Sequence, residues 1–139
     1  MKGGIFRKLY MKVRLFFLGL EFPLEDKLFD CRHADFQGAL AQSRESDELQ
    51  IVHADLGDKN FAAYVYSIPL NRIIGKLGRQ LTQDLLRVFK KGFCLDGEIS
   101  MIGKDEDGFF RCEIRIFDRA SFMLPYLPDL PYLTSESNE

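Results

Sequence analysis

Hydrophobic and branched residues recur along the chain in short runs separated by turn-forming residues, and this pattern predicts mainly β-strands. Residues 13–22 are dense in branched and aromatic side chains and stop at Pro23, which predicts a first core strand. Asp, Gly and Asn dominate 55–60, where their side chains and backbone favour a turn. Further strands are expected at 50–53, 61–68 and 73–77.

Two apolar runs near the end of the chain, Phe93–Ile102 and Phe109–Phe117, flank an acidic loop that contains glycine. Such a pair predicts a closing hairpin. In the second run apolar residues alternate with charged ones, so one face of that strand is expected to be buried and the other solvated. The apolar positions are Cys112, Ile114 and Ile116, and the charged positions are Arg111, Glu113 and Arg115.

The clearest helical pattern lies at Arg79–Lys91, where leucine, valine and phenylalanine recur at helical spacing. Gly92 stands where a C-terminal cap belongs, and the basic last turn complements the helix dipole. A weaker pattern within 24–48 predicts a short helix or an irregular excursion. Its apolar positions are Ala34, Phe36, Ala39 and Leu40.

The chain has 139 residues, of which 46% are hydrophobic and 29% charged, and this composition predicts a single globular domain. The fold class is expected to be mainly β with α, in the α+β class, with one well-defined packed helix. We expect a basic N-terminal arm at 1–12, a domain at 13–118 with an acidic insertion at about 24–48, and a tail rich in Pro, Tyr and Leu at 119–139.

Charge is distributed in blocks, although the net charge of the whole chain is only −2. Basic segments at 1–20 and 59–96 alternate with acidic segments at 21–58 and 97–139. The near-balance excludes a protein that coats nucleic acid indiscriminately, so any basic surface is local. An anionic ligand would bind the basic segments, whereas the simpler interpretation is that the charges only solvate the surface.

Motifs of metal, nucleotide and nucleophilic chemistry are missing from the chain. The three cysteines are widely spaced and the two histidines, His33 and His53, do not stand at metal-ligand spacing. No phosphate-binding loop or hydrolase motif occurs. We therefore expect no cofactor, no metal and no enzymatic activity. The apolar run at 15–20 is too short for a signal sequence or a membrane span, so a cytoplasmic protein with reduced thiols is expected.

Three short motifs in order along the chain resemble the pattern of the HIRAN domain family. Leu18–Pro23 corresponds to an opening strand with glycine and an aromatic-proline end. Asp58, Lys59 and Asn60 correspond to the heart of a polar turn, and Ile74–Leu77 precedes the helix as in the family. The resemblance covers roughly residues 13–117 and implies an OB-like or SH3-like small β-barrel. HIRAN domains occur alone in bacteria and phages, and they bind DNA, in some members at the 3′ end of a single strand.

From the resemblance and the charge pattern we expect a non-catalytic DNA-binding accessory factor that assists a larger DNA-processing enzyme, such as a helicase, a nuclease or a CRISPR effector. The DNA could be single-stranded, tailed or duplex. Gly57 and Glu21 depart from the family pattern at an aromatic and a basic position. The expected nucleic-acid-binding residues are Lys76, Arg79, Arg72, Lys90, Lys91, Lys59, Asp58, Asn60, Phe22, Lys12 and Arg14.

The alternative is a protein-protein adaptor or dimerisation subunit with little affinity for naked DNA. Prolines in the tail disfavour a helix, and the aromatic and leucine residues between them predict that the tail docks on another surface. A homodimer through the tail or an edge strand would satisfy the same pattern. The expected partner interface consists of Pro125, Tyr126, Leu127, Leu130 and Tyr132.

Overall fold

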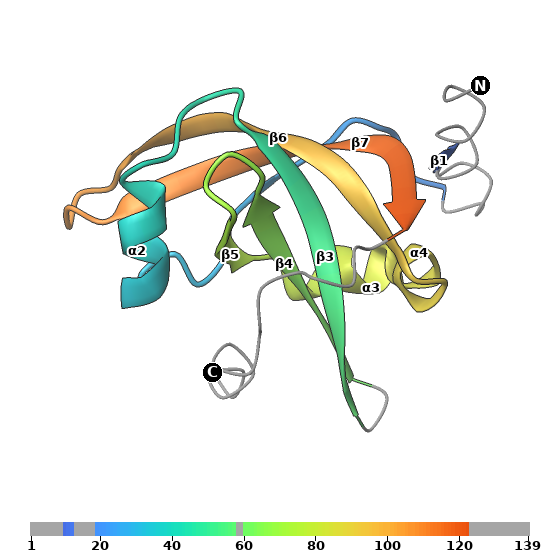
Figure 1. Cartoon of the computed structure of the whole chain (residues 1–139). Coiled ribbons are helices and arrows are strands. Elements are labelled where there is room, and N and C mark those ends of the chain that lie inside the picture. Colours follow the sequence, from blue (N-terminus) through green and yellow to red (C-terminus); the bar gives the residue numbers. More distant parts are fainter. Residues whose placement is uncertain (1–9, 13–18, 58–59, 123–139) are drawn as a thin grey trace.

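The computed structural model describes residues 10–12, 19–57 and 60–122, and they form one antiparallel sheet with short helices packed on it (Figure 1). The protein is therefore mainly β, in the α+β class, as predicted. The strands are β1 (Tyr10–Lys12), β2 (Leu24–Lys27), β3 (Glu48–Gly57), β4 (Asn60–Ser67), β5 (Arg72–Lys76), β6 (Phe93–Lys104) and β7 (Phe110–Phe122). The helices are α2 (Ala34–Leu40), α3 (Arg79–Asp84) and α4 (Leu86–Lys90).

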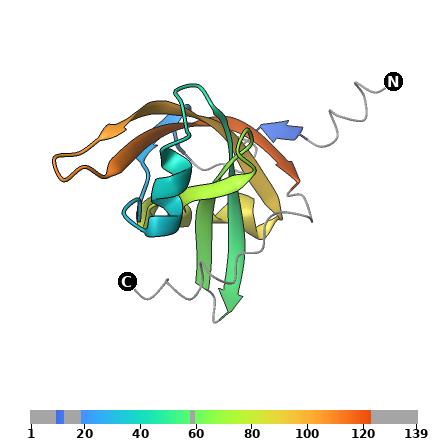
Figure 2. The same cartoon turned by 60° about the vertical axis from the view of Figure 1, so that its left-hand side comes forward.

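The sheet has the strand order β1-β7-β6-β3-β4-β5, and β2 also pairs with β7. β6 and β7 form the predicted hairpin and arch over the molecule, with α3 and α4 on the inner side of the arch (Figures 1 and 2). Just beyond β2, Phe29 pairs with Lys76 of β5 in an isolated antiparallel bridge. The Phe29 amide donates to the Lys76 carbonyl at 2.8 Å, and the Lys76 amide donates back at 3.1 Å. One residue pair thus joins the two sides of the sheet.

Alternation along β7 agrees with the sequence prediction, because Cys112, Ile114 and Ile116 are buried. They belong to the main core cluster together with residues of every long strand and of α4, among them Ile51, Val65, Ile74, Val88 and Leu95. Burying this apolar face is the main stabilising contribution to the fold.

The predicted helix at 79–91 is wrong in one respect, since the segment forms two helices. Leu85 separates α3 from α4 with φ −99° and ψ 10°, outside helical geometry. α3 contacts β4 and α4 contacts β6. A single straight helix would not follow the curved sheet from one strand to the other, and the break lets Leu85 remain completely buried. Gly92 ends the segment with φ +86°, as the cap prediction requires.

The acidic segment at 24–48, which was expected to be an insertion, contributes a strand to the sheet and a helix to the core. β2 pairs with β7 over Leu24–Lys27, and α2 buries Phe36, Ala39 and Leu40. In contrast, the described residues of the expected first strand, 19–22, form no strand. A strand pairs through its backbone, so an acidic segment can join the sheet. In β2, Glu25 and Lys27 are exposed, whereas Asp26 shares the less exposed face with Leu24.

The outer edge of β7 carries two short strands, one after the other. β1 pairs with it at Tyr10–Lys12 and β2 pairs at Leu24–Lys27. β7 itself runs to Phe122, past the domain end expected at residue 118. Within the described ranges, no helix combines the length and apolar character that a membrane span requires.

His53 of β3 lies in the core between the rings of Phe61 and Phe89, at centroid distances of 5.7 and 5.2 Å. Its Nε2 atom is buried and has no hydrogen-bond partner. Burial lowers the pKa of His53 below its usual value of 6.5, although a hydrogen bond with the Phe93 backbone opposes this shift. The folded protein therefore holds this imidazole in its neutral form near neutral pH.

Stability should consequently fall as the pH is lowered through about 6.5, because the unfolded chain then binds a proton that the folded chain rejects. We expect the urea midpoint to decrease between pH 7.5 and pH 5.5. The His53→Leu variant should lose most of this decrease, whereas His33→Gln, at a partly exposed histidine, should retain it. An equal decrease in wild type and His53→Leu would contradict the assignment.

Candidate functional site

Phe29 is a large apolar side chain that remains 37% exposed. One side of its ring lies against Gly78, the residue that precedes α3. A Cβ atom at Gly78 would lie 2.6 Å from Cε1 of Phe29, so a side chain at this position would displace the ring. Glycine at 78 therefore allows the aromatic ring to rest on the backbone at the end of β5.

Cationic residues lie over this ring and on the chain segment that it contacts. The Nζ atom of Lys27 lies 5.3 Å from the ring centroid, and Lys76 is the backbone partner of Phe29. Arg79 directly follows Gly78 and is exposed. Side chains two residues apart in an extended strand point to the same face, which places Lys27 beside Phe29 and Lys76 beside Gly78. We call this set the Phe29 platform: Lys27, Phe29, Lys76, Gly78 and Arg79.

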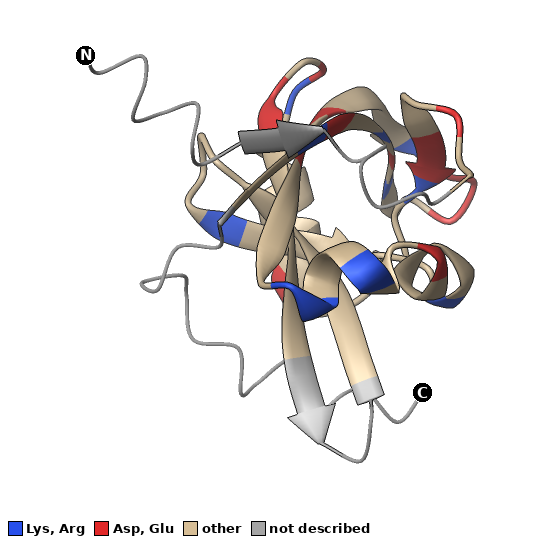
Figure 3. Ribbon diagram, turned by 90° about the vertical axis from the view of Figure 1, so that its right-hand side faces the viewer, with Lys and Arg blue, Asp and Glu red and all other residues tan. Residues whose placement is uncertain are grey.

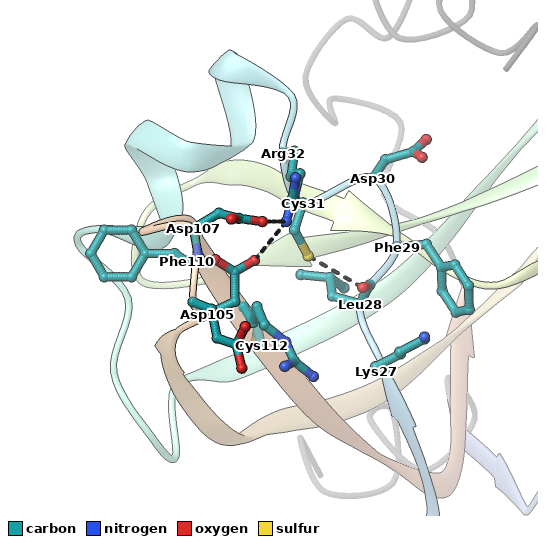
Figure 4. A pocket seen from close by; sticks show the side chains of 12 residues that line it. Lys27, Leu28, Phe29, Asp30, Cys31, Arg32, Asp105, Asp107, Phe110 and Cys112 are labelled. Atoms are coloured by element: carbon teal, nitrogen blue, oxygen red, sulfur yellow. Dashed lines mark hydrogen bonds and ion pairs between the residues drawn. The ribbon is translucent and has the colours of Figure 1, made fainter.

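Lys27 and Phe29 of the platform, together with Asp30, line one side of a pocket of about 510 Å³ between the segment after β2 and the tip of the β6–β7 hairpin (Figure 4). At the opposite wall Arg32 pairs with Asp105 at 3.2 Å and Asp107 at 2.6 Å. The Arg32 guanidinium also lies 4.6 Å from the ring centroid of Phe109. Arg32 thus partly neutralises the hairpin carboxylates, and Lys27 supplies a cation on the side of Phe29.

Two thiols lie in the same pocket, and neither is suited to nucleophilic or metal chemistry. Burial raises the pKa of Cys31 to about 11 and that of Cys112 to about 12. Both thiols are consequently protonated at neutral pH, and a thiolate is the form that attacks substrates or binds metals. The part of the chain that the structure describes also contains no cluster of three His, Cys, Asp or Glu side chains arranged for a metal ion.

Gln37 of α2 holds the pocket walls together through its side-chain amide. Nε2 donates to the carbonyl oxygens of Cys31 at 2.6 Å and Phe110 at 3.0 Å. Oε1 accepts from the Phe110 amide at 2.9 Å. The side chain thus pairs with Phe110 as a neighbouring strand would, and it connects the segment that carries Phe29 to β7.

Lys76 ends β5 and Arg79 begins α3 three residues later, whereas several other predicted residues lie elsewhere. Arg72 begins β5 and donates to the Asp35 carbonyl at 3.3 Å, near α2. Lys90 and Lys91 are exposed at the end of α4. Phe22 is partly buried and packs against the main core cluster, so it fills the core.

Other predicted residues lie beyond what the structure describes. Lys12 and Asn60 belong to β1 and β4, but the positions of their side chains are not described. The remaining positions fall outside the described residues altogether: Arg14, Asp58, Lys59, Pro125, Tyr126, Leu127, Leu130 and Tyr132.

The sequence prediction missed Lys27, Phe29 and Asp30, which line the pocket. Phe29 and Asp30 also contact Lys76. The available signal was the alternation of Lys27 with Phe29, but the acidic surroundings pointed to an insertion. A second basic surface continues along α3 and α4, whose cationic segments are visible in Figure 3. It comprises Arg79, Arg87, Lys90 and Lys91.

No family model, curated protein or solved structure matches the chain.

Proposed function

We propose that the protein binds single-stranded DNA, with one base stacked on Phe29. The observation that carries this proposal is an exposed aromatic ring with the Lys27 ammonium over it and Lys76 as its backbone partner. Proteins that bind single strands combine these two elements, because the ring stacks on a base while the cations contact phosphates. The Phe29 platform supplies both within one surface.

The Lys27 ammonium over the ring does not prevent stacking. An exposed cation-π contact contributes about 0.5–1 kcal/mol, whereas a stacked base contributes about 1–3 kcal/mol. Lys27 is exposed at the end of β2, so an incoming base can displace its ammonium from the ring. The displaced ammonium then remains close to the adjacent phosphate.

The distribution of charge around Phe29 favours one path for the DNA strand, away from the acidic hairpin tip and toward the cations of α3 and α4. Asp105 and Asp107 line the far wall of the pocket, and their charge disfavours phosphates there. The cations of α3 and α4 extend from Arg79 in sequence and offer further phosphate contacts. The DNA backbone accordingly follows α3 and α4 away from the hairpin tip.

The resemblance to HIRAN domains supports the same function and extends it. We propose that the sheet is an OB-like or SH3-like barrel whose two sides meet at the Phe29 and Lys76 bridge. The platform then lies at the junction of the barrel, next to Lys76 and Arg79, which correspond to the family motif. The protein would serve a larger DNA-processing enzyme as a non-catalytic subunit.

Fluorescence anisotropy with a labelled single-stranded oligonucleotide tests the proposal. Phe29→Ala should weaken binding about 5- to 100-fold, because one base loses its stacking surface. Met101→Ala is the matched control, since Met101 is 42% exposed but lies outside the pocket, and it should bind as wild type does. Binding should weaken steeply as salt increases. An equal affinity of Phe29→Ala and wild type, or no binding at low salt, would overturn the proposal.

A further inference from the structure

Asp30 has an unusual backbone conformation directly beside the platform. Its φ is +60°, in the left-handed region that residues other than glycine adopt uncommonly. This conformation interrupts the alternation of the preceding strand and brings the carboxylate to the side of Lys76. The Oδ2 atom lies 4.0 Å from Nζ of Lys76, the outer limit of an ion pair, and both side chains are partly exposed.

The carboxylate is within reach of a base that stacks on Phe29. Lys76 and Gly78 occupy the same face of the chain, two residues apart, which corresponds to roughly 7 Å in extended backbone. The Phe29 ring packs against Gly78, and the Asp30 carboxylate lies beside the Lys76 ammonium. A base centred on the ring reaches outward by half its width, and a hydrogen bond adds about 3 Å. Together these lengths cover the distance from Gly78 to Lys76. The edge of the stacked base therefore faces Lys76 and Asp30.

We propose, resting on the proposed function, that Asp30 and Lys76 select guanine at the stacked position. The edge of guanine presents a carbonyl acceptor, O6, followed by two donors, N1–H and the N2 amino group. Lys76 donates to O6, and the two oxygens of the Asp30 carboxylate accept from N1–H and N2. Lys27 and Arg79 keep the phosphate contacts.

The other bases do not match this pair. Adenine and cytosine place a ring nitrogen with a lone pair next to their amino group, and the carboxylate repels that lone pair. Thymine offers one N–H between two carbonyl oxygens. The other carboxylates of the pocket are less suitable, because Asp105 and Asp107 are occupied by Arg32 on the opposite wall. Asp30 directly follows Phe29, lines the same pocket and lies beside Lys76.

The test measures anisotropy for oligothymidylate of one length and for the same strand with one central dG, dA, dC or deoxyinosine. Wild type should bind the dG strand about 5- to 100-fold more tightly than the all-thymine strand. Deoxyinosine, which lacks the N2 amino group, should fall between them. Asp30→Asn should abolish the preference for dG and still bind the all-thymine strand, since asparagine also tolerates the left-handed backbone. Glu106→Gln, at an exposed acid of the same pocket, should retain the preference.

The outcomes separate the two proposals. Binding of the all-thymine strand that depends on Phe29 but shows no preference for dG would overturn only the guanine assignment. A preference for dG that persists in Asp30→Asn would also overturn it. If wild type binds none of the strands at low salt, the proposed function fails as well.

Discussion

Replacing Gly97 by alanine is expected to lower the free energy of unfolding by about 3 kcal/mol, a large effect for the addition of a single methyl group. A Cβ atom at Gly97 would lie 2.7 Å from the carbonyl oxygen of Arg115, which belongs to the backbone of β7. Gly97 also pairs with Leu49 of β3. β6 therefore has a partner strand on each side, and moving it away from Arg115 would disturb both ladders.

Gly103→Ala is the matched control, because Gly103 lies on the same strand with no atom within 4 Å of the position of its Cβ. Its stability should remain within a few tenths of a kcal/mol of wild type, and the reduced freedom of the unfolded chain favours a slight gain. Equilibrium urea unfolding of both variants measures the difference. If Gly97→Ala and Gly103→Ala have the same midpoint, the close approach of β6 and β7 at Gly97 is not a constraint on stability.

Replacing Gln37 by methionine is expected to cost about 2 kcal/mol of stability, because the backbone groups that lose their partner are partly buried and each contributes a desolvation cost. Methionine keeps the length and helix propensity of glutamine but loses three hydrogen bonds, to Cys31 and twice to Phe110. The segment with Phe29 should also be held less firmly against β7, so binding of the single strand should weaken under conditions in which the variant is folded.

Gln80→Met provides the control for this substitution. Gln80 is also a helical glutamine, but its amide donates only to Asp84 at 2.9 Å on the exposed surface of α3. Its loss should cost a few tenths of a kcal/mol. Urea unfolding and anisotropy of both variants together measure the effect. Similar costs at the two positions would show that the bridge from α2 to β7 adds little.

Periodicity along the chain was sufficient for most of the strands. The runs at 61–68, 73–77 and 93–117 correspond to β4, β5 and the β6–β7 hairpin within a few residues. These elements bury one face and expose the other, so apolar and polar residues alternate along the sequence of each strand. The helix at 79–91 was located correctly, but its break at Leu85 depends on the curvature of the sheet beneath it.

The candidate site was predicted only in part for a related reason. Lys76 and Arg79 were accessible from the local motif and the charge of their segment. Phe29 and Lys27 were not, because they lie in a segment with an acidic composition that resembled an insertion. Their role depends on β2 pairing with β7, and nothing in the residues of β2 alone specifies that partner.

Local patterns of residues were enough to specify the class of the fold, the positions of most strands along the chain and the basic character of the segment around Lys76. Which aromatic ring lies beside those cations was set only by the packing of the complete chain. Phe29 reaches Gly78 through two backbone hydrogen bonds to Lys76, a contact between segments far apart in the chain. Neighbouring residues record which face of an element is buried, whereas the juxtaposition of distant segments emerges only when the whole core packs.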